Sequence, residues 1–218
     1  MRKNTYLWSS EHSAEAGLCG RVPAREAGPA IGDVLFGAVN PGGKLTMTFP
    51  KSVGQIPLYY AHKNTGRPLK EGKWFEKFRS NYLDVDNDAL YPFGYGLSYT
   101  TFRFSDITLN RSSIGMDNEL VASVTVTNTG DRAGSEVVQL YIRDLVGSVT
   151  RPVKELKGFK KVKLAPGEEK AVTLTIDKKA LSFFDDVKHE WMAEPGKFEA
   201  VIGTSSRDIK GIVPFELR

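Results

Sequence analysis

Short segments with apolar residues at every second position, separated by turn signals, dominate residues 102–218 and constrain the fold most strongly. Residues 120–127 alternate in this way, and the turn sequence Asn128-Thr129-Gly130-Asp131 follows them. Further segments of this kind lie at residues 102–109, 138–143, 156–164, 172–176, 198–202 and 209–217. About seven short strands joined by turns are typical of an immunoglobulin-like fold. We therefore predict that residues 102–218 form one β-sandwich in a mainly β protein.

The preceding region has a different pattern. Apolar residues at helical spacing predict a helix over residues 27–35 that stops at Gly37. A strong turn signal at 40–43 leads into Leu45, Met47 and Phe49, whose alternation predicts a half-buried strand ended by a proline. A helix, a turn and a strand form the closing unit of an α/β layer. We interpret residues 26–90 as the terminal remnant of an α/β domain followed by a long loop, and residues 1–25 as irregular, disordered or mistranslated.

The long loop carries the candidate site residues of the chain. Tyr59, Tyr60, His62, Lys63 and Arg67 combine aromatic rings with hydrogen-bond donors. Such a combination suits a sugar or another flat polar ligand, but it suits an interface between domains equally well. Because long ordered loops usually pack on a neighbour, we favour the interface over substrate contact.

Residues 91–101 are rich in aromatic residues and glycine. They are too apolar for a free linker and too rich in glycine for a regular helix. We predict an ordered connector that joins the preceding fragment to the sandwich.

Charge and composition exclude several classes of function. The formal net charge is +4, and the densest basic stretch, residues 154–163, lies within a predicted strand. Lysines on a strand protect a sheet edge, and no recognised nucleic-acid-binding module accompanies them, so we predict no nucleic-acid partner. There is no apolar run of about 20 residues that would span a membrane. The N-terminus lacks a signal peptide, and the single cysteine, Cys19, leaves the compartment undetermined.

No complete sequence motif for catalysis, cofactor binding or metal binding is present. Residues 84–88 begin like a calcium loop, but Ala89 and Tyr95 occupy the positions that need glycine and glutamate. Asp185 and Asp186 are adjacent in sequence, which favours a role in a turn over paired acid–base chemistry. The three histidines are widely spaced and suggest no catalytic triad. We therefore predict no catalytic, cofactor or metal residue in the chain.

Several motifs together resemble family 3 of the glycoside hydrolases. The resemblance covers about residues 26–218, in order. The segments that carry it are 32–37, 40–45, 48–50, 56–68, 91–100, 126–130, 138–141 and 152–159. The first four are similar to the end of the family's second domain and the loop after it, 91–100 to its C-terminal signature, and the last three to its fibronectin type III-like domain.

The resemblance implies a β-glucosidase or a related exo-acting β-glycosidase of the retaining type, which hydrolyses O-glycosyl bonds. Such enzymes use an aspartate nucleophile on a barrel and a glutamate acid/base in the second domain, and neither motif occurs here. It therefore implies a C-terminal fragment that is inactive alone, whose partners are the missing barrel and α/β domains and which meets β-glucosides or oligosaccharides only within the intact parent. The parent is expected to be periplasmic or secreted.

One alternative stays open on the sequence. The sandwich and the aromatic loop could form a glycan-binding or scaffold module, since sandwiches serve many roles. Binding of cello-oligosaccharides that is lost when Tyr59 and Tyr60 are truncated would favour this alternative.

Overall fold

The computed structural model describes residues 17–18, 27–69 and 73–218, which form two compact units, Met1–Val39 and Asn40–Arg218. Most of the region predicted to be irregular, residues 1–25, lies outside the described residues. In the first unit the predicted helix is confirmed as α2 (Ala27–Leu35), and none of its residues is buried. No helix among the described residues has the length and apolar character needed to cross a membrane.

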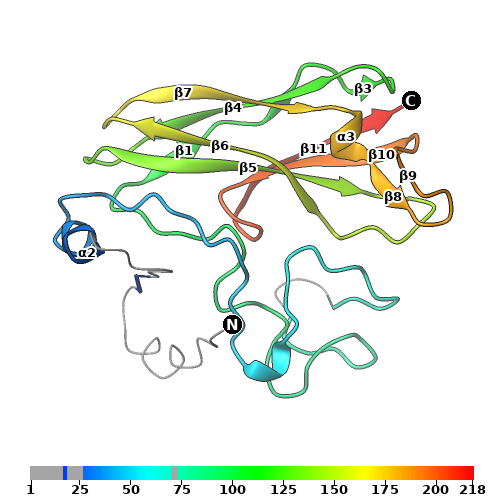
Figure 1. Ribbon diagram of the computed structural model, residues 1–218, viewed down its shortest axis with the longest axis horizontal. Helices are drawn as coiled ribbons and strands as arrows, with labels where there is room; N and C mark the ends of the chain where they lie inside the picture. Colours follow the sequence, from blue (N-terminus) through cyan, green and yellow to red (C-terminus); the bar gives the residue numbers. More distant parts are fainter. Residues whose placement is uncertain (1–16, 19–26, 70–72) are drawn as a thin grey trace. The chain divides into compact units, whose positions relative to one another are not determined.

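The second unit contains a sandwich of two sheets, drawn one above the other in Figure 1. The four-stranded sheet consists of β1 (Phe102–Phe104), β2 (Thr108–Leu109), β4 (Leu120–Asn128) and β7 (Glu169–Ile176). β4 pairs with the other three strands. The five-stranded sheet has the order β3 (Ser113–Ile114), β11 (Ile209–Leu217), β10 (Gly196–Gly203), β5 (Gly134–Asp144), β6 (Glu155–Leu164). All pairs are antiparallel except β3 with β11. The predicted β-sandwich is therefore correct.

The core lies between the two sheets, where alternate residues of each strand point inward. Along β4 every second residue, from Leu120 to Asn128, is buried. β7 adds core residues from the same sheet as β4, and β5, β10 and β11 supply the facing aliphatic and aromatic residues, among which Phe198 stacks on Phe215 with ring centroids 5.6 Å apart. Burial of alternate residues is why the period of two in the sequence located the strands correctly.

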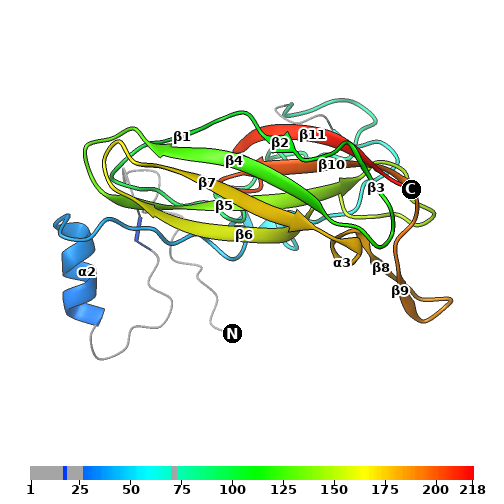
Figure 2. The same ribbon diagram turned by 90° about the horizontal axis from the view of Figure 1, so that it is seen from above.

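A small hairpin extends the sandwich at one end and was not predicted. It consists of β8 (Phe183–Asp185) and β9 (Glu190–Met192) and follows the short helix α3 (Lys178–Leu181), as Figure 2 shows. At its turn the Asp185 carboxylate accepts hydrogen bonds from the backbone of Val187 and Lys188. The predicted turn role of this acidic pair is thus confirmed for Asp185.

The lysine-rich strand β6 lies at the edge of the five-stranded sheet. Its residues Lys160, Lys161 and Lys163 are exposed, whereas Val162 and Leu164 face the core. This is the protected strand edge that the sequence predicts.

The strand predicted over residues 45–49 is wrong as a continuous element. A bend at Thr46 and Met47 interrupts it, and Phe49 forms only an isolated bridge to Tyr91. The flanking residues do pair: Leu45 donates to the Tyr95 carbonyl at 2.8 Å, and Phe49 donates to the Tyr91 carbonyl at 2.8 Å. The partner of this extended segment is therefore the aromatic connector.

Gly94 shows why the connector needs glycine. Its φ is +82°, a region that favours residues without a side chain, and a Cβ atom there would overlap the side-chain amide of Gln139 on β5. Gly94 therefore allows the connector backbone to contact the sandwich directly.

Candidate functional site

The described residues of the loop segment (51–69 and 73–90) lie against the outer face of the five-stranded sheet, the face turned away from the core (Figure 1). Lys63 forms an isolated bridge to Pro152, and the Val153 amide donates to the His62 carbonyl at 2.9 Å. Hydrogen bonds between backbones fix where the loop passes over the sheet.

Tyr60 anchors the loop to that face. Its ring stacks on Phe93 at 4.4 Å between centroids and meets the edge of Tyr141 on β5 at 5.7 Å. Its hydroxyl accepts a hydrogen bond from the Leu156 amide at 3.2 Å. Tyr60 is therefore a packing residue, and its truncation would disturb the interface as well as any ligand contact.

Tyr141 is fully buried although it points away from the sandwich core. Burial raises the pKa of its hydroxyl far above the usual range, and the neighbouring Tyr60 adds to this effect. The neutral hydroxyl donates to the Gln139 side-chain carbonyl at 2.6 Å. The loop segment and the connector thus create a second, smaller core on the outer face.

Gln139 links three parts of this second core. Its amide nitrogen donates to the Gly94 carbonyl at 3.2 Å and to the Thr204 carbonyl at 2.6 Å, while its carbonyl accepts from Tyr141. The side chain is 3% exposed. It connects the aromatic connector to the turn between β10 and β11.

A second glutamine braces the loop segment internally. The amide nitrogen of buried Gln55 donates to the backbone carbonyls of Asp86 and Asp88, at 2.8 and 3.2 Å. Its carbonyl accepts from the Lys51 amide at 2.6 Å. The two ends of the segment are thereby held together.

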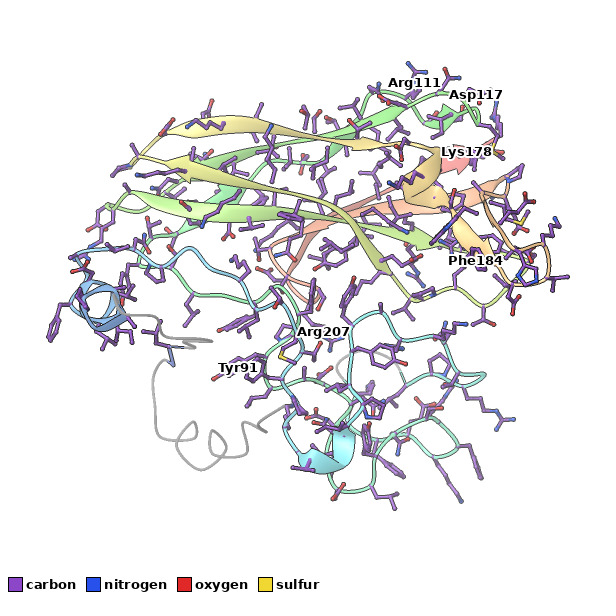
Figure 3. The ribbon with its side chains drawn as sticks, in the orientation of Figure 1. Tyr91, Arg111, Asp117, Lys178, Phe184 and Arg207 are labelled. Carbon is purple, nitrogen blue, oxygen red and sulfur yellow. The ribbon has the colours of Figure 1, made fainter. Side chains whose placement is uncertain are left out.

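The acidic run at residues 84–88 takes part in two ion pairs. Lys51 contacts the Asp86 carboxylate at 2.8 Å, and Asp88 pairs with Arg207 from the turn between β10 and β11. Figure 3 shows Arg207 on the side of the sandwich that faces the loop segment. Among the described residues, no cluster of three or more His, Cys, Asp or Glu side chains could hold a metal ion.

These ion pairs predict that the loop segment loosens in acid. Burial alone would raise the pKa of Asp86, but hydrogen bonds from Lys51 and the Asp88 backbone, with the charges of Lys51 and Arg207, hold that pKa below its usual value. A carboxyl with a lowered folded-state pKa contributes stability that is present above its unfolded pKa of about 4 and is lost as the pH falls through the folded value. Amide protection factors in the loop segment should therefore decrease below about pH 4.

Asp86→Asn is the matched variant for this prediction, because it keeps the shape of the side chain and removes the titration. Its loop amides should be less protected than those of the wild type at neutral pH and should change less between about pH 5 and pH 3. An equal decrease in both proteins over that range would contradict the assignment.

A cavity of about 780 Å³ lies between the loop segment and the outer face of the sheet. On the loop side it is lined by Tyr59, His62, Lys63, Asn81, Tyr82 and Asn87. On the sheet side the lining includes Arg143, Val153, Lys154, Glu199, Val201 and Ile212. Its volume lies within the range of small-molecule sites, which is about 300–1,000 Å³.

The structure brings three of the five candidate residues together at this cavity. Tyr59, His62 and Lys63 line it, whereas Tyr60 packs against the sheet beneath the loop. Arg67 is exposed and is not among the lining residues, and its backbone carbonyl accepts from the Ser80 amide at 2.9 Å.

Sequence reasoning missed the charged residues on the sheet side. Arg143 and Glu199 are register partners on β5 and β10, and their side chains form an ion pair at 3.3 Å. Asp88 and Arg207 also line the cavity. The only local signal for Arg143 and Glu199 is that both occupy outward positions of their strands. This signal does not reveal that a loop covers them.

The fold and this loop together define a class: an immunoglobulin-like sandwich that carries a long connector and loop on the outer face of one sheet. Residues 2–99 match the glycosyl hydrolase family 3 C-terminal domain, and residues 136–206 match the fibronectin type III-like domain. The chain belongs to glycoside hydrolase family 3, as its C-terminal portion with the fibronectin type III-like domain. The match begins at residue 2, so it extends further toward the N-terminus than the motifs indicated.

Several relatives are named as β-glucosidases, and two from Formosa agariphila are named as a β-xylosidase and a putative β-xylosidase. The chain is 50% identical over 204 residues to the periplasmic beta-glucosidase of Salmonella typhimurium, covering 94% of this chain and 26% of that protein. It is 46% identical over 185 residues to thermostable beta-glucosidase B of Acetivibrio thermocellus, covering 84% of this chain and 24% of that protein. The structure of the beta-glucosidase of Listeria innocua in complex with gluconolactone superimposes with a TM-score of 0.84 at 44% identity. The match covers 89% of this chain and 27% of the Listeria chain. The chain thus spans about a quarter of the length of these relatives.

Proposed function

We propose that this chain is the C-terminal part of a retaining, exo-acting β-glucosidase, in which the sandwich and the loop segment pack against the catalytic domains. The observation that carries the proposal is the 50% identity over 204 residues to a periplasmic beta-glucosidase of which the chain covers 26%. In this proposal residues 26–90 belong to the end of an α/β domain, residues 91–101 are the connector, and β-glucosides reach the site only in the assembled enzyme.

Exposed apolar side chains in the loop segment support a packing role. Trp74, Phe75, Phe78 and Leu83 are 59%, 54%, 72% and 85% exposed. Clusters of exposed apolar residues of this kind mark surfaces that another domain covers. Phe78 also has a φ of +65°, which is unfavourable for a bulky residue and is retained where the surroundings require it.

The chain alone should not hydrolyse glycosides. Retaining hydrolysis needs two carboxyl groups about 5–5.5 Å apart on either side of the scissile bond, and neither family motif for them occurs in this sequence. We expect no release of nitrophenol from an aryl β-glucoside by the purified chain. Turnover that is still measurable after contaminating glycosidases have been excluded would overturn this part of the proposal.

A chimera tests the role within a β-glucosidase. The matching 204 residues of the Salmonella relative are replaced by those of this chain, and hydrolysis of the aryl β-glucoside is measured. We expect an active chimera, because half of the replaced residues are identical and the fold is retained. A chimera that is folded and monodisperse but inactive would contradict the proposal.

The loop's packing role is tested in the same chimera with Phe78→Ser and Leu83→Ser together. Because both side chains are exposed in this chain, the double variant should leave the melting temperature of the isolated chain nearly unchanged. It should lower the melting temperature or the activity of the chimera, where a neighbouring domain would cover these side chains. An unaffected chimera would show that this surface packs on nothing.

A further inference from the structure

The end of the sandwich where β5 finishes carries its own cluster of exposed apolar side chains. Residues 102–218 are described throughout, and eight large apolar side chains among them are exposed. Six of the eight belong to the loop after β5 and to the hairpin β8–β9, which lie at the same end of the sandwich (Figure 1). We call these six the tip surface: Leu145, Val146, Val149, Phe184, Val187 and Trp191. Apolar side chains gathered at one place mark a site of interaction.

Contacts beneath the tip surface hold it in place. The Arg151 guanidinium carbon lies 5.0 Å from the ring centroid of buried Phe183, the first residue of β8, and the guanidinium donates to the Leu181 carbonyl at 3.3 Å. The Ser148 hydroxyl donates to the Glu194 carboxylate at 2.6 Å, which joins the loop after β5 to the segment after β9. The apolar side chains therefore stand on a fixed framework, and association would cost little ordering of the backbone.

The hairpin lacks the edge protection that the larger sheet has. β8 and β9 form a two-stranded sheet, so each strand has a free edge in that sheet. The edge strand β6 carries three exposed lysines, whereas the exposed register partners of the hairpin are Phe184 and Trp191, with ring centroids 5.8 Å apart. Figure 3 shows Phe184 at this end of the sandwich. Strand edges without lysine or another blocking feature pair with strands of another chain.

The tip surface lies far from the point where the chain enters the second unit. Asn40 is the first residue of that unit, and its side chain donates to the carbonyl of Ala133, the residue before β5. The tip surface begins with Leu145, the residue after β5, and the 11 residues of this strand span about 35 Å. The chain that precedes Asn40 thus joins the sandwich at the other end of β5. This placement favours an occupant other than the preceding domains of the proposed parent.

The chemistry of the tip surface favours a protein partner. Four of its six side chains are aliphatic and offer no aromatic face to a sugar ring. The exposed charges of the hairpin include Asp186, Lys188 and Glu190, with more negative than positive charge, and such a surface is not attracted to anionic lipids. A copy of the same surface is apolar and has the same free strand edges. A two-fold axis brings identical patches together, so each can cover the other.

We propose that the tip surface is where two copies of this chain associate about a two-fold axis. The rings of Phe184 and Trp191 pack against the apolar side chains of the second copy, and a free hairpin edge of each copy meets that of the other. The same patch is used twice, so association stops at a dimer. Six side chains are fewer than the roughly 20–30 residues a side of a standard interface, so the dimer is weak and reversible. The whole surface is present in this chain and does not depend on the hydrolase proposal.

The test is sedimentation velocity of the full chain over a roughly hundredfold range of concentration. We expect a reversible equilibrium of monomer and dimer with a dissociation constant on the order of tens of micromolar. Because apolar contacts are not screened, the dimer should persist in about 1 M salt. A chain that stays monomeric up to about 300 µM, or that forms species larger than a dimer, would overturn the proposal. Dissociation in high salt would indicate pairing of charges and contradict an apolar interface.

Matched variants locate the interface. Val187→Ser with Trp191→Ser removes two exposed apolar side chains of the tip surface and should weaken dimerisation at least about tenfold, with little change in melting temperature. Phe78→Ser with Leu83→Ser removes two side chains of similar exposure from the loop segment and should leave the dissociation constant unchanged. Equal losses in the two double variants would show nonspecific apolar association and overturn the assignment.

A mixture of wild type and the tip double variant tests the two-fold axis. In a two-fold dimer the mixed pair loses half of the free energy that the variant dimer loses, so a tenfold loss becomes roughly threefold. If the tip of one copy bound a different surface of the next, the variant would still offer that second surface. Binding of the variant to wild type with full affinity would therefore overturn the two-fold arrangement.

Discussion

Asn128→Ala should lower the free energy of unfolding by about 3–4 kcal/mol, because it leaves several buried polar groups unpaired at once. The Asn128 side chain is fully buried at the end of β4. Its carbonyl accepts from the Thr100 hydroxyl at 2.7 Å and the Gly130 amide at 3.1 Å. Its amide nitrogen donates to the carbonyls of Arg132 and Leu164, at 2.7 and 3.1 Å.

These contacts join the connector, the turn after β4 and the end of β6 at one point. Thr100 belongs to the connector, and Leu164 is the last residue of β6. Alanine supplies no replacement for any of the four bonds, and the cavity it leaves is small and buried. We therefore expect the variant to unfold in one cooperative transition, at a lower denaturant concentration than the wild type, and not to open locally.

Chemical denaturation monitored by tryptophan fluorescence measures this loss. Asn110→Ala is the matched control, because the Asn110 side chain is exposed and accepts a single hydrogen bond, from the Val121 amide at 2.9 Å. It should cost no more than about 1 kcal/mol. Comparable losses in the two variants would contradict the account of Asn128.

Gln139→Leu should have the second largest effect and act on the connector. Leucine fills a similar volume but cannot hydrogen bond, so the carbonyls of Gly94 and Thr204 and the hydroxyl of Tyr141 lose their partner. With each buried unpaired group costing about 1–3 kcal/mol, we expect a loss of about 3 kcal/mol. The connector should also separate from the sheet more often.

Hydrogen exchange distinguishes this opening from global unfolding. The Gly94 amide, which donates to the Leu45 carbonyl, and the Ser206 amide, which donates to the Phe93 carbonyl, should exchange faster in Gln139→Leu. Amides in the centre of β4 should lose only the protection that follows from the global change in stability.

Gln55→Leu provides the comparison for this prediction. Gln55 is as deeply buried, but all its partners lie within the loop segment. It should therefore expose amides of the loop segment and leave the Gly94 amide protected. Protection at Gly94 that is unchanged in Gln139→Leu, or lost equally in both variants, would contradict the role assigned to Gln139.

Most of the fold was predictable because its signals are local. Alternation along residues 120–127 reflects the pleat of β4, and it located that strand to within one residue of its observed end. The predicted strand at 45–49 failed for an instructive reason. Its alternation describes an extended backbone correctly, but a strand also needs a continuous partner, and the connector pairs with it only on either side of the bend.

The candidate site was only partly predictable. Tyr59, His62 and Lys63 stood out because aromatic rings and donors are adjacent in the chain, and all three line the cavity. Tyr60 has the same local signal but lies in a turn and packs against Tyr141. Sequence pattern cannot tell which of the two adjacent tyrosines faces the sheet.

Local periodicity and turn chemistry were thus sufficient for the sandwich and for the lysine-rich edge, because backbone geometry repeats every two residues along a strand. The cavity and its charges required the folded chain. Arg143 and Glu199 are 56 residues apart, and Asp88 and Arg207 are 119 residues apart. The first contact depends on the pairing of β5 with β10, and the second depends on how the loop segment crosses the sheet.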